Sequence, residues 1–261
     1  MNTTAQNFQI NEVSADKGYG SLSNYAAIKD HGAVPYIAHM NEISTQPFGA
    51  TGNSLEVSLV TDRPPGFFEG TGMPDPGWWE ALWPDPAKVL RDVGVTPGMD
   101  VIDLCCGDGW FTFPLATIAR SIVAIDIDAA LLEAAKVRIA ERGGAPNCTF
   151  VEADAYDISS VVRGPIDYVF LANAFHGVPD RPRLSRAVHE ILKPGGLFGI
   201  VSWHARPREE TPVLGEPRGP ATEQRMTPEQ TVAGVEPSSL KFRNRVEVSP
   251  HHYAAVFERL G

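Results

Sequence analysis

The chain has 261 residues, of which 43% are hydrophobic and 21% charged, and its formal net charge is −10 at pH 7. This length and apolar content suffice for one catalytic core, and the negative charge gives no general attraction for nucleic acid or an anionic membrane. No run approaches the ~20 apolar residues of a membrane span, and no leader pattern is seen. We therefore expect a cytoplasmic monomer or homodimer with a small-molecule substrate and neither a nucleic-acid nor a membrane partner.

Residues 1 to about 70 are rich in Asn, Ser, Thr and Gly and show no sustained helical period. Within them, the segments 14–19, 24–28 and 32–37 resemble a fragment of DDE-type transposases, but nothing later in the chain supplies the further carboxylates of a two-metal site. We expect residues 1–72 to be an N-terminal extension, poorly packed or partly disordered, with the natural start of the enzyme near Met73. The alternative is a divergent cap over the active site.

The densest aromatic cluster of the chain follows at residues 77–86. Trp79 and Trp83 are four residues apart, so they share one face of a predicted helix. Two interpretations stay open, because these indoles either pack the helix onto the sheet or form a wall of the substrate site. Asp85 and Pro86 then begin a second helix, as its N-cap and first-turn residues.

A run of Val, Ile and Leu at residues 101–104 contains Asp103 and leads into Gly107-Asp108-Gly109. This pattern predicts a strand, a tight turn and the start of a helix, in which the glycines let the backbone approach a ligand and the helix start offers free N–H groups. Cys105 and Cys106 precede the glycines, but adjacent cysteines point to opposite faces of a strand and no Cys-x-x-Cys accompanies them. We expect no metal site.

Three further apolar runs end on polar residues, at Asp126, Asp154 and Asn173. Helix-length segments separate the runs, which predicts a parallel sheet whose carboxyl ends share one ligand site. Asp126 is placed to accept hydrogen bonds from two ribose hydroxyls, Asp154 could take the exocyclic amine of a purine, and Asn173 forms the fourth wall. Dinucleotide binding is disfavoured, because the third glycine of Gly-x-Gly-x-x-Gly is absent at Thr112.

The remaining elements are read from periodicity and from turn residues. Helices are expected at 110–120, at 128–142, where Ala129, Leu132, Ala135 and Val137 would pack on the sheet, and at 180–192. The turn Lys193-Pro194-Gly195-Gly196 should end the last of these helices. Strands are then expected at 197–203, 242–248 and 253–257, and the last two give an antiparallel finish.

From about Trp78 to Phe257 the chain resembles the class I S-adenosylmethionine-dependent methyltransferases. The resemblance implies an α/β fold with a Rossmann-like seven-stranded sheet, mostly parallel with an antiparallel last strand and helices on both faces. It also implies S-adenosylmethionine as cofactor, bound by Asp103, Cys105, Gly107, Gly109, Asp126, Ile127, Asp154, Ala155 and Asn173. Two departures stand out. Cys105 occupies a position where the family has glycine, and residues 173–176 lack the Pro-Pro-Tyr that suits amine substrates, which weakens a DNA or protein N-methylation reading.

Residues 204–226 lie between two predicted strands, inside a domain expected to span 73–261. This loop is either a solvated connection or a substrate lid. As a lid, it would contact the substrate through an anion-binding arginine. The candidate substrate contacts are Trp79, Trp83, Arg206, Arg208, Arg218, His252 and Tyr253.

We expect an enzyme that methylates a small-molecule nucleophile, with a thiol or sulfide as one candidate acceptor, because a thiolate is accessible near neutral pH. An O-methyltransferase would need a base, for which His176 and His204 are the candidates. Two readings from other classes stay open. One is a non-catalytic S-adenosylmethionine-binding sensor, and the other is an interaction protein whose functional part is residues 1–70.

Overall fold

The computed structural model describes residues 12–15, 34–37 and 73–261. The chain divides into two compact units, Met1–Arg63 and Pro64–Gly261. In the first unit, strands β1 (Glu12–Ala15) and β2 (Val34–Ile37) pair in parallel. The rest of the transposase-like segment, and the loose packing expected for the extension, fall outside the described residues.

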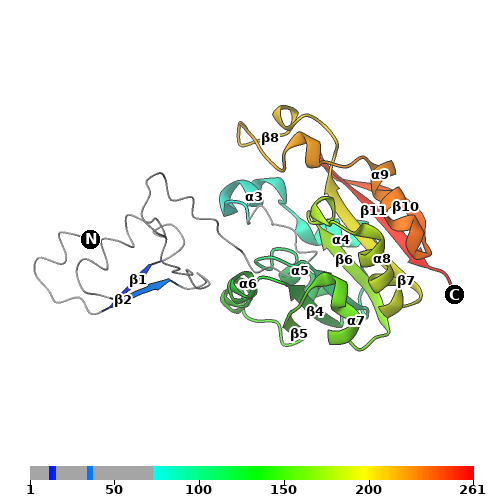
Figure 1. Cartoon of the computed structure of the whole chain (residues 1–261), viewed down its shortest axis with the longest axis horizontal. Helices are drawn as coiled ribbons and strands as arrows, with labels where there is room; N and C mark the ends of the chain where they lie inside the picture. Colours follow the sequence, from blue (N-terminus) through cyan, green and yellow to red (C-terminus); the bar gives the residue numbers. More distant parts are fainter. Residues whose placement is uncertain (1–11, 16–33, 38–72) are drawn as a thin grey trace, which may run out of the picture. The chain divides into compact units, whose positions relative to one another are not determined.

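Strands of the second unit form one seven-stranded sheet in the order β10-β11-β7-β6-β3-β4-β5 (Figure 1). In chain order they are β3 (Asp100–Leu104), β4 (Ser121–Asp126), β5 (Cys148–Glu152), β6 (Ile166–Ala172), β7 (Leu192–Trp203), β10 (Leu240–Ser249) and β11 (His252–Arg259). Neighbours are parallel except at β11, which is antiparallel to both β7 and β10. The predicted fold class is confirmed.

Strand order reverses between β3 and β6. The chain leaves β3 to one side through β4 and β5, and it later crosses to the other side for β6 and β7. In open parallel sheets, ligands bind outside the carboxyl ends of the strands at such a reversal. At the carboxyl ends of β3 and β6, the two strands at this reversal, lie the turn after Leu104 and the residues after Ala172.

Three helices begin near the predicted positions, after Asp85, which was predicted as a cap, and after Asp128 and Asp180. The side chains of these three residues accept backbone N–H groups of the first turn. The α-helices are α3 (Pro76–Leu82), α4 (Pro86–Asp92), α5 (Thr112–Ile118), α6 (Ala129–Glu141), α7 (Ile158–Val161), α8 (Arg181–Ile191) and α9 (Pro228–Val235). Shorter elements are η2 (Ala155–Asp157), η3 (Phe175–Gly177), η4 (Arg208–Glu210), η5 (Thr222–Gln224), η6 (Glu236–Ser238), β8 (Pro212–Val213) and β9 (Glu216–Pro217).

Apolar side chains fill both faces of the sheet. On β6, Tyr168 and Phe170 are buried in one core with residues of α3, α4 and α5, whereas Val169 and Leu171 are buried in the other core with residues of α7, α8 and α9. Successive strand residues point to opposite faces. A strand covered on both faces is expected to read as a continuous apolar run, which is how the segment 166–172 reads.

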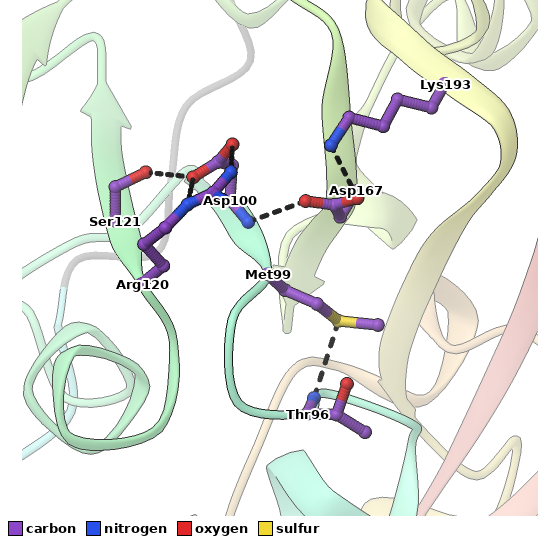
Figure 2. A network of polar contacts seen from close by, with 7 residues as sticks. All are labelled: Thr96, Met99, Asp100, Arg120, Ser121, Asp167 and Lys193. Atoms are coloured by element: carbon purple, nitrogen blue, oxygen red, sulfur yellow. Dashed lines mark hydrogen bonds and ion pairs between the residues drawn. The ribbon is translucent and has the colours of Figure 1, made fainter.

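Polar side chains join the amino ends of four strands, β3, β4, β6 and β7 (Figure 2). Asp100 at the start of β3 pairs with Arg120 and accepts a hydrogen bond from Ser121 Oγ at 2.7 Å. Its backbone N–H donates to Asp167 Oδ2 at 2.8 Å, and Lys193 Nζ donates to Asp167 Oδ1 at 2.7 Å. The hydrogen bond from Arg120 lowers the pKa of Asp100 to about 2. Because these groups satisfy one another's hydrogen bonds and charges, we interpret this edge of the sheet as structural.

Two expectations about local structure were wrong. The segment Lys193-Pro194-Gly195-Gly196 is not a turn ahead of the strand, because it lies inside β7 and forms an irregularity in the pairing with β6 between Ile166 and Tyr168. Val137 does not pack on the sheet, since 57% of its surface is exposed, whereas Leu132 and Ala135 are buried. Among the described residues, none of the helices combines the length and apolar character that a bilayer crossing requires.

Candidate functional site

The turn after β3 contains three residues in the left-handed backbone region, with φ of 57° at Cys105, 56° at Gly107 and 80° at Gly109. Cys105 stands where the resembling family has glycine, and it still adopts the conformation that favours glycine. Gly109 packs against α6, since a Cβ on it would lie 2.9 Å from the Cβ of Ala135. The turn is therefore pressed onto the following helix and has no room for a side chain at position 109.

Asp126, at the end of β4, ties the neighbouring strand to this turn. Its Oδ2 accepts the backbone N–H of Gly107 at 2.8 Å, and its Oδ1 accepts the N–H of Asp128 at 3.0 Å. Burial raises the pKa of Asp126. Each carboxylate oxygen has a second lone pair, so the group can still accept hydrogen bonds from ligand hydroxyls. Met73 lies over the turn, because a Cβ on Gly107 would be 2.6 Å from its Sδ.

Asp103 lies below the turn, in the last part of β3, and is only 2% exposed. Its Oδ2 accepts a hydrogen bond from Thr112 Oγ1 at 2.6 Å, which links the strand to the start of α5. Burial raises the pKa of Asp103 from 3.8 to about 7, although the hydrogen bond from Thr112 acts in the opposite direction. We interpret Asp103 as a structural residue that stabilises the turn through Thr112 and whose carboxyl group has a raised pKa.

We expect Asp103 to make the cofactor-free protein less stable as the pH rises from about 4 to about 7. Over this window the folded carboxyl holds a proton that the unfolded one has lost, so the free energy of unfolding falls with pH, by at most about 1.4 kcal/mol per unit. Urea unfolding at pH 5 and pH 7.5 measures this for the wild type and for Asp103→Asn, which cannot ionise. Equal pH slopes for the two proteins would contradict the prediction.

Three of the predicted polar strand ends gather around one thiol. Burial raises the pKa of Cys105, and the negative charges of Asp126, Asp103 and Asp154 raise it further, in that order. Asp154 follows β5 and accepts the backbone N–H of Tyr156 at 2.9 Å, which starts η2. Of the other predicted cofactor contacts, Ile127 follows β4 and Ala155 is the first residue of η2, and both are half-buried. The structure thus brings the predicted carboxylates to one edge.

The fourth strand end, Asn173, has a left-handed backbone with φ of 60°. Its backbone N–H donates to the carbonyl oxygen of Val201 at 2.8 Å. Its Oδ1 lies 3.0 Å from His252 Nε2, and His252 Nδ1 lies 2.9 Å from Ser249 Oγ. The Nδ2 of Asn173 is buried and has no partner among the described residues. Asn173 is therefore linked to the strand pair β10–β11 as well as to β6.

The aromatic candidates lie in the protein core. Trp79 and Trp83 are buried with edge-to-face rings whose centroids are 5.8 Å apart, and Trp83 also contacts Phe111 at 5.3 Å. Their position suits the packing interpretation, and Trp83 in addition contacts His252 beside Asn173, with ring centroids 4.5 Å apart. Tyr253 is fully buried, and its hydroxyl lies 2.7 Å from Thr231 Oγ1 on α9.

The two histidines predicted as bases face different partners. His204 follows β7, and its Nε2 lies 2.7 Å from Glu247 Oε2 on the edge strand β10. His176 lies in η3 after β6, where burial and then the charges of Arg181 and Arg225 lower its pKa. The two rings therefore have different hydrogen-bond and charge neighbours, and a base role of His176 or His204 stays a prediction.

Arg225 organises the loop 204–226, and no sequence pattern predicted this role. Its guanidinium donates to four acceptors: the carbonyl oxygens of Pro220 at 3.1 Å, Arg206 at 3.1 Å and Arg218 at 2.9 Å, and Thr211 Oγ1 at 3.0 Å. It also lies 5.0 Å from the ring centroid of Trp203, the last residue of β7. Three of the acceptors are backbone carbonyls, which any residue type supplies, so no motif could announce the contact.

The predicted arginines of this loop have separate roles. The guanidinium of Arg218 lies 5.4 Å from the ring centroid of Trp78 on α3. Arg206 and Arg208 are exposed, and Arg208 Nε donates to the carbonyl oxygen of Gly219 at 3.1 Å. Gly219 lies against the β7 end, since a Cβ on it would be 2.7 Å from an indole carbon of Trp203. The loop is thus packed on the carboxyl end of β7.

The residues at this edge fit S-adenosylmethionine. Positions 107 and 109 carry no side chain of their own, and the flexible Met73 side chain covers Gly107. Asp126 offers acceptors for ribose hydroxyls, and Asp154 offers an acceptor for an adenine amine. A surface cavity of about 730 Å³ lies elsewhere, at the amino ends of β6 and β7, and is lined by residues such as Arg163 and Arg259. Among the described residues, no group of three or more metal-binding side chains is found.

Residues 101–196 match a family described as a methyltransferase domain. An uncharacterized methyltransferase of Synechocystis sp. is 33% identical over 117 residues, or 44% of this chain and 52% of that protein. A 2-phytyl-1,4-naphtoquinone methyltransferase of Nostoc sp. is 31% identical over 49% of this chain and 56% of that protein. A tRNA 5-carboxymethoxyuridine methyltransferase of Escherichia coli is 24% identical over 48% of this chain and 47% of that protein. The chain thus spans about half the length of the curated relatives it matches.

Among solved structures, a SAM-dependent methyltransferase from Aquifex aeolicus has a TM-score of 0.60 at 21% identity, covering 71% of this chain and 94% of that chain. The cyclase SpnF has a TM-score of 0.56 at 16% identity, covering 75% of this chain and 88% of that chain. These likenesses establish the fold, which hosts more than one chemistry. Sheet topology and sequence match agree: residues 101–196 match the methyltransferase-domain family, and the second unit has the fold of the class I S-adenosylmethionine-dependent methyltransferases.

Proposed function

We propose that this protein transfers a methyl group from S-adenosylmethionine to a small-molecule nucleophile, with hydrosulfide or a small thiol as the first candidate acceptor. The proposal is carried by the loop 204–226. Arg225 fastens this loop to itself and to Trp203, and Arg218 reaches Trp78 on α3. A loop held in this way over the carboxyl edge favours an enclosed acceptor over a large polymer.

When bound, the cofactor supplies an electrophilic methyl group on a sulfonium leaving group. The protein then has to hold the donor, align the nucleophile and exclude water. We assign the first task to the turn at 105–109 with Asp126 and Asp154, and the exclusion of water to Trp83, Trp203 and the loop. A thiolate needs no general base near neutral pH.

Histidine-assisted O-methylation is the less favoured alternative. His204 is already paired with Glu247, and burial lowers the pKa of His176. A phenol or alcohol acceptor would need a free base at the reacting atom. The relative from Nostoc is named for a naphthoquinone substrate, which also suggests a small acceptor, whereas the tRNA substrate named for the Escherichia coli relative is disfavoured here by the net charge of −10.

The test is turnover of an acceptor panel with methyl-labelled S-adenosylmethionine. The full chain is incubated with hydrosulfide, small thiols, a phenol, a hydroquinone, a carboxylate and bulk tRNA, and products are identified by mass spectrometry. We expect a labelled S-methyl product and an equal amount of S-adenosylhomocysteine. Cofactor binding without turnover of any acceptor would instead indicate a sensor, and labelled tRNA would overturn the small-acceptor proposal.

We further propose that residues 73–261 carry this activity and that the extension 1–72 is dispensable for it. The same panel, applied to a chain that begins at Met73, tests this directly. Retained turnover supports the division. Loss of turnover with a folded shorter chain would favour a role of residues 1–72 in the active site.

A further inference from the structure

His252 is a fully buried histidine at the start of β11, with 0% of its surface exposed. Its ring lies between two indoles, with centroid distances of 4.5 Å to Trp83 and 4.1 Å to Trp203. Both ring nitrogens have partners, since Nδ1 lies 2.9 Å from Ser249 Oγ and Nε2 lies 3.0 Å from Asn173 Oδ1. The ring therefore connects the β10–β11 turn with the end of β6.

The chemistry of these partners fixes the direction of the hydrogen bonds. Burial lowers the pKa of His252 well below its usual value, and the neighbouring His251, His204 and Arg225 act in the same direction. A neutral imidazole carries one N–H, and an amide oxygen can only accept. Nε2 must then carry the hydrogen and donate to Asn173, which leaves Nδ1 to accept the hydroxyl hydrogen of Ser249.

Asn173 is consequently held with its oxygen turned to His252 and its NH₂ group free. The backbone at this position is fixed too, since its N–H donates to the carbonyl oxygen of Val201 at 2.8 Å and its φ is 60°. The buried Nδ2 has no acceptor among the described residues, and neither has the indole N–H of Trp83, whose ring contacts His252. Buried donors without acceptors favour a ligand atom that accepts hydrogen bonds.

We infer that Ser249 and His252 form a positioning relay that presents the Asn173 amide N–H to the methyl acceptor, and that this donor selects a deprotonated sulfur or oxygen nucleophile. The acceptor part of this inference rests on the proposed function, whereas the relay does not. His252 acts through Asn173 and is not a base, since its Nδ1 is occupied by a hydroxyl and its Nε2 by an amide oxygen. A protonated amine cannot accept a hydrogen bond from the Asn173 amide N–H and would bind poorly.

The relay can be tested without turnover. Long-range ¹H–¹⁵N correlation spectra of the full chain between pH 6 and pH 8 show which nitrogen of His252 carries the hydrogen. We expect the Nε2–H tautomer throughout and a shift of the tautomer population in Ser249→Ala. Ser185→Ala is the matched control, because Ser185 is a buried serine on α8 whose hydroxyl has no partner among the described residues. An Nδ1–H tautomer, a protonated ring, or an unaltered spectrum in Ser249→Ala would overturn the relay.

The selecting role is tested with Asn173→Asp, which keeps an oxygen for His252 and replaces the donor by a second oxygen. With hydrosulfide and thiophenol as acceptors, we expect kcat to fall by about 10²- to 10³-fold, with thermal unfolding close to that of the wild type. An undiminished kcat would contradict donor selection. If the wild type methylates neither acceptor, the proposed function fails for these compounds while the spectra still decide the relay.

Discussion

Gly109→Ala is expected to lower the free energy of unfolding by about 2–5 kcal/mol, the sum of a left-handed backbone penalty and overpacking. The φ of Gly109 is 80°, and an added Cβ would lie 2.9 Å from the Cβ and 3.1 Å from the Cα of Ala135. The Cα cannot move without α6, so the turn itself has to shift. Equilibrium urea unfolding measures the loss.

Gly98→Ala is the matched control for this substitution. Gly98 has a similar φ of 88°, but a Cβ there would meet nothing within 4 Å. Only the backbone penalty of about 1–2 kcal/mol remains at that position. Equal losses for the two variants would show that the contact between the turn and α6 does not restrict position 109.

Asp126→Ala is expected to weaken the binding of S-adenosylmethionine by about 10- to 150-fold, the range for a hydrogen bond to a charged group. The same carboxylate also accepts the N–H groups of Gly107 and Asp128, so the variant should unfold at a lower urea concentration as well. Isothermal titration calorimetry with the cofactor gives the affinity. Asp126→Asn, which keeps one acceptor oxygen, is expected to lie between the wild type and Asp126→Ala.

Asp85→Ala separates the two effects of the previous substitution. Asp85 caps α4 by accepting the N–H of Lys88 at 2.8 Å, and losing such a cap typically costs about 1 kcal/mol of stability. Asp85 lies at the start of α4, away in sequence from the strand ends that are predicted to bind the cofactor. Its variant should therefore bind the cofactor normally. Unchanged affinity in Asp126→Ala, at a measurable loss of stability, would mean that the ribose site has been misplaced.

The sequence by itself determined the seven-stranded sheet and the edge at which its polar strand ends meet. Strand and helix periods are local properties, so the run at 166–172, the cap Asp85 and the helix starts at Asp128 and Asp180 could be predicted directly. Strand ends in a parallel sheet meet at one edge. For that reason Asp103, Asp126 and Asp154 could be brought together before their contacts were known.

Only the tertiary structure decided which partners Asn173, His204 and Arg225 have. The Asn173–His252 hydrogen bond joins residues 79 positions apart, and the His204–Glu247 pair joins residues 43 positions apart. Such pairs depend on the register between strands, which no local pattern encodes, and Arg225 binds mainly backbone carbonyls, which every residue has. Local periodicity also could not tell that Val137 lies on the solvent side of α6. The chemical type of each side chain is thus known from the sequence, whereas its hydrogen-bond partner depends on how the strands are arranged in the sheet.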